Sequence, residues 1–429
     1  RDLHSFPTRR SSDLEINTIQ NMADFFQKTG LPKALSLGYL GVMIFMMSEG
    51  LEQTWLSKYI TDQNFNSATL FAVYGIAVTI SSWLSGVISE TFGLRRAMLA
   101  GFFIYLVGVI GYAGSGLPNL NWPVLMTTYA LKGLGYPLFA YSFVVWISYR
   151  VEQKTLSTAQ GWFWFVFTGG YQVLGAYYGA WSFAHLGVIP TAWTSLVFAT
   201  IGMVFAIFLN KAPDTNLFAD PDAEKGNKFK EFFRGLGIIR REPKVLAGGI
   251  VRIINTISQF AFLVYMPLYM RHMGLTDAQW ASMWGIIFFI NIFANLLFGF
   301  VGDKIGWRTT IEWFGGVGCA VGVLLFFYAP QICGNWWFIL VCGILWGIML
   351  AAYVPLSALV PSLVTTDKGA AVSVLNLGAG LATFVGPLLV GLFATPDAPV
   401  VGYTRVSWAL AILYLSSSLM TWLFLKEKK

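Results

Sequence analysis

Charged side chains are scarce in this chain. Asp, Glu, Lys and Arg make up 11% of its 429 residues, whereas soluble domains contain about 25%. Hydrophobic residues make up 56%, aromatic residues 17%, and the mean hydropathy is +0.62. A soluble protein of this composition could not cover its surface with polar groups, so lipid must surround much of the chain.

Cysteine and histidine are also sparse, with three of each. Cys319, Cys333 and Cys342 do not have the spacing of a ligand cluster, and an odd number of cysteines predicts no disulfide framework. The histidines are scattered, and the polar segments contain no Ser–His–Asp set and no phosphate-cradling loop. We therefore expect no metal, no cofactor and no catalytic residues, which argues against a membrane-embedded enzyme or a sensor.

The first residues need separate treatment. The stretch from His4 to Leu14 reads like a translated DNA-sequencing adapter, so we interpret residues 1–14 as an artefact and exclude them from the fold. Without them the net charge falls from +7 to +6. The natural start then lies either upstream of Glu15 or at Met22, and residues 15–33 are expected to be a cytoplasmic segment.

Long apolar runs dominate the remainder. A spanning helix needs roughly 20 apolar residues, and the runs of this kind indicate an all-α membrane protein with twelve transmembrane helices in two halves. The first half, over 34–210, contains runs at 34–57, 67–89, 97–115, 123–148, 157–181 and 189–210. The second half, over 245–425, contains runs at 245–269, 278–301, 309–329, 335–359, 369–393 and 403–425. A polar linker at 211–244 joins them, and a tail at 426–429 follows.

Positive charge predicts the orientation of these helices. If both ends are cytoplasmic, the cytoplasmic loops and tail after residue 33 contain 18 Lys or Arg and the outer segments contain three, Lys58, Arg271 and Arg405. Such an excess is typical of the cytoplasmic side. The positive net charge therefore reflects membrane topology, and we expect no nucleic acid as a partner.

One short pattern occurs in both halves. Residues 86–96 read Gly-Val-Ile-Ser-Glu-Thr-Phe-Gly-Leu-Arg-Arg, and residues 299–308 read Gly-Phe-Val-Gly-Asp-Lys-Ile-Gly-Trp-Arg. The glycines suit close helix approach and a tight turn. The acids and arginines can pair across helix ends, Asp303 with Arg308, and Glu90 with Arg95 or Arg96. Two copies at matching places indicate an internal repeat, and both lie in loops predicted to be cytoplasmic.

Two six-helix halves, a basic central linker and this doubled loop resemble the major facilitator superfamily. The loops depart from the family pattern at Thr91, Leu94 and Trp307, where basic residues are usual. The resemblance implies that the loops form a cytoplasmic gate of weak ion pairs, although a role in topology and packing stays open. The residues of this predicted gate are Gly86, Glu90, Gly93, Arg95, Arg96, Gly299, Asp303, Lys304, Gly306 and Arg308.

Within this superfamily the chain is similar to the polyol permeases, which include ribitol and arabinitol transporters. The stretches that resemble them are 48–57, 136–143, 161–164, 252–257 and 368–377. The resemblance implies a monomer in the bacterial cytoplasmic (inner) membrane. It also implies import of a linear pentitol such as ribitol, arabinitol or xylitol, by proton symport with alternating access. The expected partners are thus the polyol, protons and the lipid bilayer.

Four charged residues stand inside the predicted helices, where each costs at least a few kcal/mol unless it faces a cavity or a partner. Glu49 and Glu52 are three residues apart, so we place them on one helical face with Gln53 beside them. Two carboxylates close together resist joint ionisation, which makes either a candidate proton carrier. Glu52 is expected to be the more exposed of the two. Lys132 can pair with one of these glutamates, either as a switch or as a fixed ion pair.

A polyol site should combine hydrogen-bonding side chains with aromatic faces. Arg252 is included, although it can instead extend to the membrane surface. The resemblance ranks residues on the first, fourth, seventh and tenth helices highest. The predicted substrate residues are Gln53, Tyr136, Arg252, Asn255, Gln259, Tyr353 and Asn376, with Trp55, Tyr141, Trp164, Tyr171, Gln172, Tyr265, Asn291 and Asn295 as further candidates.

An organic anion, such as a dicarboxylate or a sugar acid, is the alternative substrate. Lys132 and Arg252 would then supply counter-charges. If these cations are unpaired in the cavity, an anion is favoured; if the glutamates neutralise them, a neutral polyol is favoured.

Overall fold

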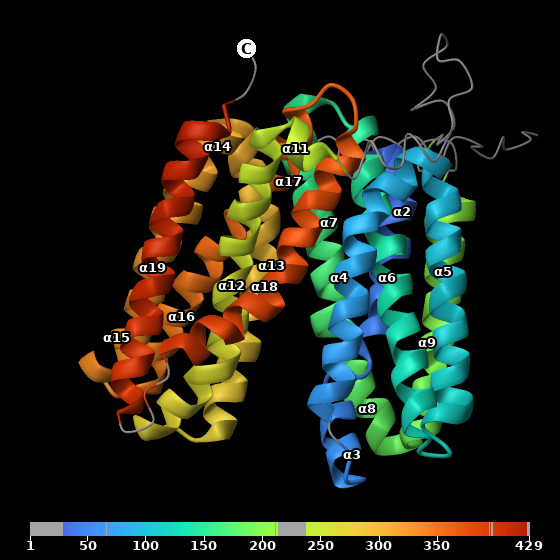
Figure 1. Cartoon of the computed structure of the whole chain (residues 1–429), viewed down its shortest axis with the longest axis horizontal. Helices are drawn as coiled ribbons and strands as arrows, with labels where there is room; N and C mark the ends of the chain where they lie inside the picture. The colour runs from blue at the N-terminus through green and yellow to red at the C-terminus, as the bar shows by residue number, and fades with distance from the viewer. Residues whose placement is uncertain are drawn as a thin grey trace, which may run out of the picture.

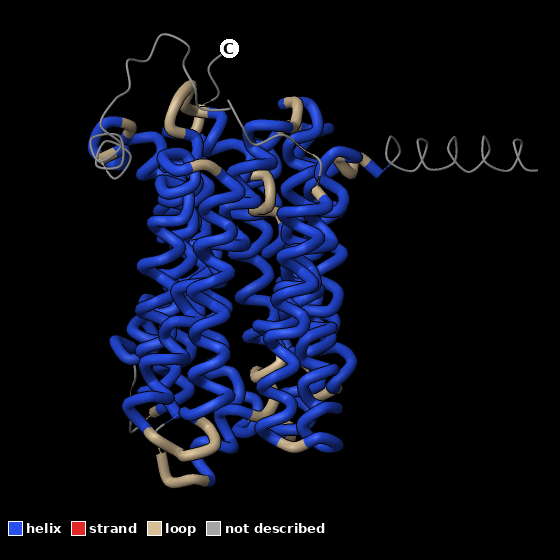
Figure 2. Tube along the Cα trace, turned by 90° about the vertical axis from the view of Figure 1, so that its right-hand side faces the viewer, coloured by secondary structure: helices blue, strands red, loops and turns tan. Residues whose placement is uncertain are grey.

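The computed structural model describes residues 29–65, 67–210, 212, 237–393, 395 and 398–426. The predicted adapter-derived segment 1–14, most of the segment 15–33, most of the linker and residues 427–429 of the tail lie outside these residues. Within them the chain is helical with short connections and contains no strand, which confirms the all-α prediction. Figure 2 shows the helices running side by side along one direction, with most loops at the two ends.

The two halves have similar series of helices. In the first half the elements are η1 (Lys33–Leu35), α2 (Ser36–Gly50), α3 (Leu56–Asp62), α4 (Ser67–Phe92), α5 (Leu94–Gly111), η2 (Tyr112–Gly116), α6 (Trp122–Arg150), η3 (Gln153–Thr155), α7 (Leu156–Thr168), η4 (Gly169–Gly175), α8 (Ala176–Leu186), α9 (Val188–Met203) and η5 (Val204–Leu209). In the second half they are α11 (Ile238–Arg241), α12 (Pro243–His272), α13 (Asp277–Ile305), α14 (Trp307–Thr310), η6 (Ile311–Gly318), α15 (Cys319–Ile332), α16 (Trp336–Ala351), α17 (Leu356–Ser362), α18 (Lys368–Phe393) and α19 (Pro399–Phe424).

Ten helices of the described chain are long and apolar enough to cross a membrane, and they coincide with ten of the twelve predicted runs. The run at 157–181 is also helical, within α7, η4 and α8. The run at 34–57 is divided, because α2 ends at Gly50 and a turn over 51–55 leads into α3. Gly50 lies directly against the neighbouring η4, since a Cβ there would be 2.0 Å from the carbonyl oxygen of Tyr171.

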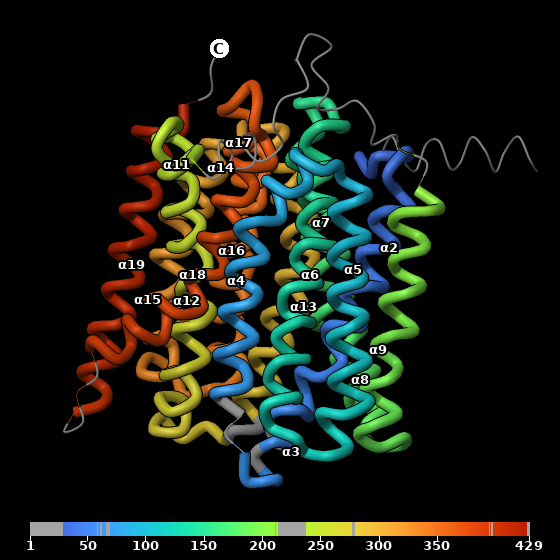
Figure 3. The backbone as a smooth tube through the Cα atoms, turned by 45° about the vertical axis from the view of Figure 1, so that its right-hand side comes forward, coloured from blue at the N-terminus to red at the C-terminus, as the bar shows by residue number. Residues whose placement is uncertain are grey.

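Figure 1 shows the helices of the second half on the left and those of the first half on the right. The halves meet along two pairs of helices, α4 with α18 and α7 with α13, and α4 is seen beside α18 in Figure 3 as well. At one such contact a Cβ on Gly86 would lie 1.9 Å from the carbonyl oxygen of Gly369. Small residues allow this approach, as is typical of helix packing in lipid.

The two copies of the repeated loop have matching backbones. Gly93 ends the connection from α4 to α5 with φ of 96°, and Gly306 connects α13 to α14 with φ of 101°. Residues with a Cβ rarely adopt positive φ, so these turns require glycine. The predicted tight turn of each copy is therefore confirmed, at Gly93 in the first and at Gly306 in the second.

Candidate functional site

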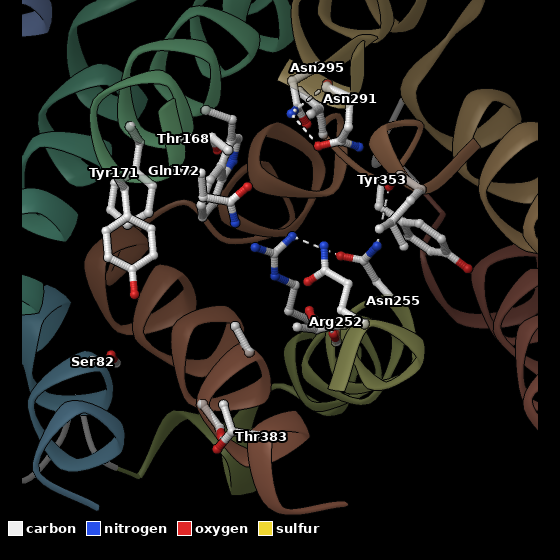
Figure 4. Close-up of a pocket in the computed structure, with 18 of the residues that line it drawn as sticks. Ser82, Thr168, Tyr171, Gln172, Arg252, Asn255, Asn291, Asn295, Tyr353 and Thr383 are labelled. Atoms are coloured by element: carbon white, nitrogen blue, oxygen red, sulfur yellow. Dashed lines mark hydrogen bonds between the residues drawn. The ribbon is translucent and has the colours of Figure 1, made fainter. Parts of the chain in front are cut away.

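A cavity of about 230 Å³ lies between the two halves. Figure 4 shows polar side chains entering it from several helices. The residues of the first half that line it are Val78, Ser82, Tyr136, Tyr141, Trp164, Phe167, Thr168, Tyr171 and Gln172. Those of the second half are Arg252, Asn255, Thr256, Gln259, Phe260, Phe288, Asn291, Asn295, Leu350, Tyr353, Val354, Ala379, Gly380 and Thr383. Pockets for drug-sized ligands measure about 300–1,000 Å³, so this cavity suits a smaller molecule.

The helix α12 presents its polar face to this cavity. Arg252, Asn255, Thr256 and Gln259 follow the helical spacing of three and four residues, so they lie along one side of α12. Arg252 Nη1 donates a hydrogen bond to Asn255 Oδ1 at 3.0 Å, and Asn255 Nδ2 donates to the carbonyl of Leu350 at 3.3 Å. Asn255 therefore holds the guanidinium group at the cavity wall, as the dashed line in Figure 4 marks.

Arg252 introduces a positive charge that no carboxylate of the described residues balances. Its guanidinium carbon lies 4.8 Å from the ring centroid of Trp164, so an aromatic face covers one side of the cation. The alternative in which Arg252 extends to the membrane surface is not observed, because its side chain lines the central cavity. The cavity wall is therefore electropositive at this point.

Amide side chains form other parts of the wall. On α13, Asn295 Nδ2 donates to the Asn291 carbonyl at 2.9 Å and to Asn291 Oδ1 at 3.1 Å, and Asn291 Nδ2 donates to the Gly347 carbonyl at 2.7 Å. On η4, the Oε1 atom of Gln172 is buried without a hydrogen-bond partner. A buried polar atom of this kind is costly unless a ligand or water bonds to it.

A second polar cluster lies in the first half. Lys132 on α6 contacts both carboxylate oxygens of Glu52 at 2.6 Å, and both side chains are almost fully buried. Three tyrosine rings surround the ammonium group, with centroids 5.2–5.4 Å from Nζ: those of Tyr105, Tyr112 and Tyr129. The predicted pairing of Lys132 with a glutamate of the first run is confirmed. The prediction that Glu52 is relatively exposed is wrong, because the turn after α2 directs it to Lys132.

Glu49 has different partners. The hydroxyl of Tyr74 on α4 donates a hydrogen bond to Glu49 Oε1, while Glu49 Oε2 is buried without a hydrogen-bond partner. No ion pair of Glu49 occurs among the described residues, since Lys132 is bonded to Glu52. The expectation of one shared helical face for Glu49, Glu52 and Gln53 is wrong, because α2 ends between the two carboxylates. Gln53 is exposed and donates to the Tyr171 carbonyl at 3.3 Å.

The structure brings five of the seven predicted substrate residues to the cavity, namely Tyr136, Arg252, Asn255, Gln259 and Tyr353. Gln53 and Asn376 are outside its described lining. Asn376 is buried, and its Nδ2 atom has no hydrogen-bond partner. Of the further candidates, Tyr141, Trp164, Tyr171, Gln172, Asn291 and Asn295 line the cavity, whereas Trp55 and Tyr265 do not.

Four hydroxyl residues of the lining were not predicted, Ser82, Thr168, Thr256 and Thr383. Of these, only Thr256 could have been predicted from the sequence, because it continues the polar face of α12. The other three lie on helices of mixed character, where a single hydroxyl can equally bond to its own helix. Thr383, for example, donates to the Gly380 carbonyl at 2.7 Å.

The acids of the repeated loops cap helices of the opposite half. Glu90 accepts hydrogen bonds from the backbone N–H groups of Gly369 and Ala370, at the start of α18. Asp303 accepts from the backbone N–H groups of Ser157 at 3.1 Å and Thr158 at 2.7 Å, at the start of α7. Helix N-termini have unpaired N–H donors and a partial positive charge, so carboxylates stabilise them.

The expected pairing of these acids with the loop arginines is therefore wrong. Arg308 pairs with Glu312 at 2.7 Å and donates to the Trp422 carbonyl at 2.6 Å. Arg95 donates to the Asn210 and Ala212 carbonyls at 2.7 and 3.0 Å. In these contacts Arg308 binds within the second half and Arg95 binds the junction of the first half with the linker, while Glu90 and Asp303 reach the opposite half. Arg96 and Lys304 are exposed.

Two bundles of membrane-spanning helices around a central polar cavity define a multi-pass membrane transporter of small molecules. The model of the Major Facilitator Superfamily matches residues 34–332 and 288–429. The chain belongs to this family, whose members are transporters rather than enzymes.

Three known proteins show the range of similarity. The chain is 44% identical to the "Alpha-ketoglutarate permease" of Bacillus subtilis, over 95% of this chain and 92% of the relative. It is 37% identical to the "Ribitol transporter" of Klebsiella pneumoniae, over 90% and 91%, which confirms the predicted resemblance to polyol transporters. Its fold matches the crystal structure of the E. coli fucose:proton symporter FucP with a TM-score of 0.74 and 10% identity, over 92% of this chain and 98% of that chain.

Proposed function

We propose that this chain imports a small organic anion whose carboxylate group binds Arg252. The observation that carries this proposal is the cavity-lining guanidinium group with no carboxylate partner among the described residues. A charge in the membrane needs a partner, and a carboxylate ligand can bond to a guanidinium group through two parallel hydrogen bonds. Lys132 is not available for this role, because Glu52 already neutralises it.

The similarity to the alpha-ketoglutarate permease supports an anionic substrate. The second N–H of Asn291 Nδ2, which donates only one bond within the protein, and the Nε2 group of Gln172 would then donate to the remaining oxygen atoms of the substrate. A sugar acid uses the same chemistry, with one carboxylate at Arg252 and its hydroxyl groups at the amides. Both substrates therefore belong in the test.

A linear pentitol is the second candidate. Two observations favour it: the abundance of amide and hydroxyl side chains around the cavity, and the 37% identity to the ribitol transporter. A neutral polyol would bond to Arg252 through its hydroxyl groups but would leave the positive charge unbalanced. The anion is preferred for that reason.

We further propose that Glu49 carries a coupled proton. Its carboxyl group is buried, bonded to Tyr74 and outside the ion pair of Lys132 with Glu52, so binding and release of a proton would change its charge without breaking a standing ion pair. Glu52 is less suited, because its protonation would leave Lys132 as an unpaired buried cation. Lys132 is then a fixed partner of Glu52.

The gating proposal follows from the acid-to-helix contacts. Glu90 and Asp303 would hold the halves together at the end that we infer to be cytoplasmic, and these contacts would break when the halves tilt apart. Caps of this kind contribute about 0.5–2 kcal/mol each, which is small enough for a cycle that must populate two states. In this account the bundles of 34–210 and 245–425 move around the cavity, in a monomer with both termini in the cytoplasm of a bacterial cell.

The test is uptake into proteoliposomes of alpha-ketoglutarate, a five-carbon sugar acid and ribitol, with and without a pH gradient. We expect a carboxylate to be accumulated, and Arg252→Gln to raise its KM by about 30-fold or more, since losing one partner of a buried charge pair costs about 2–5 kcal/mol. Arg252→Lys is the matched control, because it keeps the charge and loses the planar donor pair. Uptake of ribitol without competition from either carboxylate would overturn the anion proposal in favour of the polyol.

A further inference from the structure

The side chain of Trp164 connects the two halves at the wall of the cavity. Trp164 belongs to α7 of the first half, yet both of its polar contacts reach the second half. Its ring centroid lies 4.8 Å from the guanidinium carbon of Arg252 on α12. Its indole Nε1 donates a hydrogen bond to Ser357 Oγ on α17 at 3.2 Å, and Ser357 is buried.

The position of these contacts along α7 is informative. At its N-terminus, α7 is tied to the second half through the bonds of Ser157 and Thr158 to Asp303. Trp164 lies two helical turns further along and also lines the cavity. Trp164 therefore both contacts the second half and lines the proposed substrate site.

We propose that Trp164 is a positioning residue that couples substrate binding at Arg252 to the separation of α7 from the second half. The proposal rests on the proposed function in taking Arg252 as the substrate's anchor. In the empty transporter, the guanidinium charge is stabilised by the indole ring. A bound carboxylate neutralises that charge and so weakens its attraction to the ring. The indole then also gives up its hydrogen bond to Ser357, so that neither contact holds Trp164 to the second half.

This arrangement links substrate binding to the conformational equilibrium of the two halves. A ligand shifts a conformational equilibrium only as far as it binds the two states differently. Because the substrate binds the same group that ties the halves together, its binding favours the state in which Trp164 has left Arg252. The empty transporter, by contrast, keeps both contacts and is slow to reorient.

Two conservative variants test the coupling. Ser357→Ala removes the acceptor of the indole hydrogen bond, and Trp164→Phe removes the donor while keeping an aromatic face. Exchange of substrate across a proteoliposome membrane requires only the loaded transporter, whereas net flux also requires the empty one to reorient. We expect both variants to raise the ratio of net flux to exchange by about threefold to tenfold, the range that one net hydrogen bond allows. In Ser357→Ala, which changes a residue outside the described lining of the cavity, exchange itself should stay close to the wild-type rate.

The neighbouring Trp162 provides a matched control. It lies on the same helix and also donates an indole hydrogen bond, at 2.9 Å, but to the carbonyl of Thr29, which precedes the first half and does not belong to the second. Trp162→Phe therefore removes an equivalent bond without releasing a tie between the halves, and it should leave the ratio unchanged. A rise of the ratio in this control as well would indicate general loosening of α7 and overturn the proposal.

Two other results would also overturn it. One is an unchanged ratio in both Trp164→Phe and Ser357→Ala. The other is a parallel loss of net flux and exchange, which a residue with a purely packing role would give. Arg252→Gln separates this proposal from the proposed function. If KM is normal in Arg252→Gln, Arg252 does not bind the substrate and the proposed function is wrong. If KM is raised in Arg252→Gln but the ratio of net flux to exchange is unchanged in Trp164→Phe and Ser357→Ala, only the coupling by Trp164 is wrong.

Discussion

The two halves differ in their buried charges, although both contain a serine bonded to a tyrosine hydroxyl, which in the first half is Ser48 with Tyr105. In the first half, Lys132 and Glu52 form an ion pair within a tyrosine cage. In the second half, tyrosine hydroxyls are bonded to serines, as in Tyr265 with Ser407 at 2.7 Å. Two further pairs of the same kind are Ser258 with Tyr414 and Tyr353 with Ser417.

This difference is consistent with a division of the proposed roles, with proton exchange in the first half and substrate binding in the second. The first half contains Glu49, the carboxyl group that we propose to exchange a proton, whereas the second half contains Arg252, the only cation in the described lining of the cavity. Neutral hydroxyl pairs stabilise the second half without adding a charge that would compete with Arg252. The contrast predicts that loss of a polar partner lowers stability more at the ion pair of the first half than at the hydroxyl pairs of the second.

The largest effect is expected at the ion pair. Lys132→Met leaves Glu52 as an unpaired buried carboxylate, which should lower the free energy of unfolding by about 3–5 kcal/mol. The measurement is thermal unfolding of the purified protein in detergent. The control is the double variant Lys132→Met with Glu52→Gln, which removes both charges and should recover most of the loss. Equal instability of the single and double variants would contradict the role of charge pairing.

The next effect concerns the unpaired carboxylate. Glu49→Gln cannot exchange a proton, so accumulation driven by a pH gradient of one unit should fall by about tenfold, the gradient that one coupled proton can support. Counterflow at equal pH should continue, because the loaded transporter still reorients. Tyr74→Phe, which removes the donor to Glu49, should change the pH dependence of counterflow. Normal accumulation in Glu49→Gln would exclude Glu49 as the proton carrier.

The helix caps should give an intermediate effect. Asp303→Asn removes the charge that caps α7 and should weaken the tie by about 0.5–2 kcal/mol. We expect slower cycling with nearly normal expression, measured as the transport rate per molecule of protein in the membrane. Glu90→Gln tests the equivalent cap on α18. If expression and transport fall equally, the caps serve packing rather than gating.

The smallest effect is expected at a hydroxyl pair of the second half. Tyr265→Phe removes the bond to Ser407, but Ser407 Oγ also donates to the Tyr403 carbonyl at 2.9 Å. The free energy of unfolding should therefore fall by only about 0.5–1.5 kcal/mol, with transport unchanged. A loss as large as that of Lys132→Met, in the same thermal unfolding assay, would invalidate the contrast between the halves.

Most of the fold is predictable from the sequence, because long apolar runs leave little choice of structure. The interruption after Gly50 is not predictable from the apolar run itself, and neither is the close packing of Gly50 against Tyr171, more than a hundred residues away. The pairing of Lys132 is predictable because unpaired charges are costly in lipid. The choice of Glu52 over Glu49 depends on the turn at 51–55, which no local pattern indicates.

The site shows the same limit. The polar face of α12 predicts Arg252, Asn255 and Gln259, because such residues on an apolar helix need a polar environment. The partners of Glu90 and Asp303 are not predictable, since they are backbone groups of the opposite half. A nearby arginine in the sequence suggests an ion pair, but a helix N-terminus offers an equally good partner that sequence reasoning does not weigh.

The early position of the two carboxylates bears on biosynthesis. Glu52 and its cation are separated by 80 residues. At a translation rate of about 5–20 residues per second, Lys132 is made roughly 4–16 s after Glu52. Until then the first hydrophobic segment holds two acidic groups that disfavour its insertion into the bilayer. The ion pair that neutralises Glu52 can therefore form only once α6 has been made, so this contribution to the stability of the first bundle arises late in its translation.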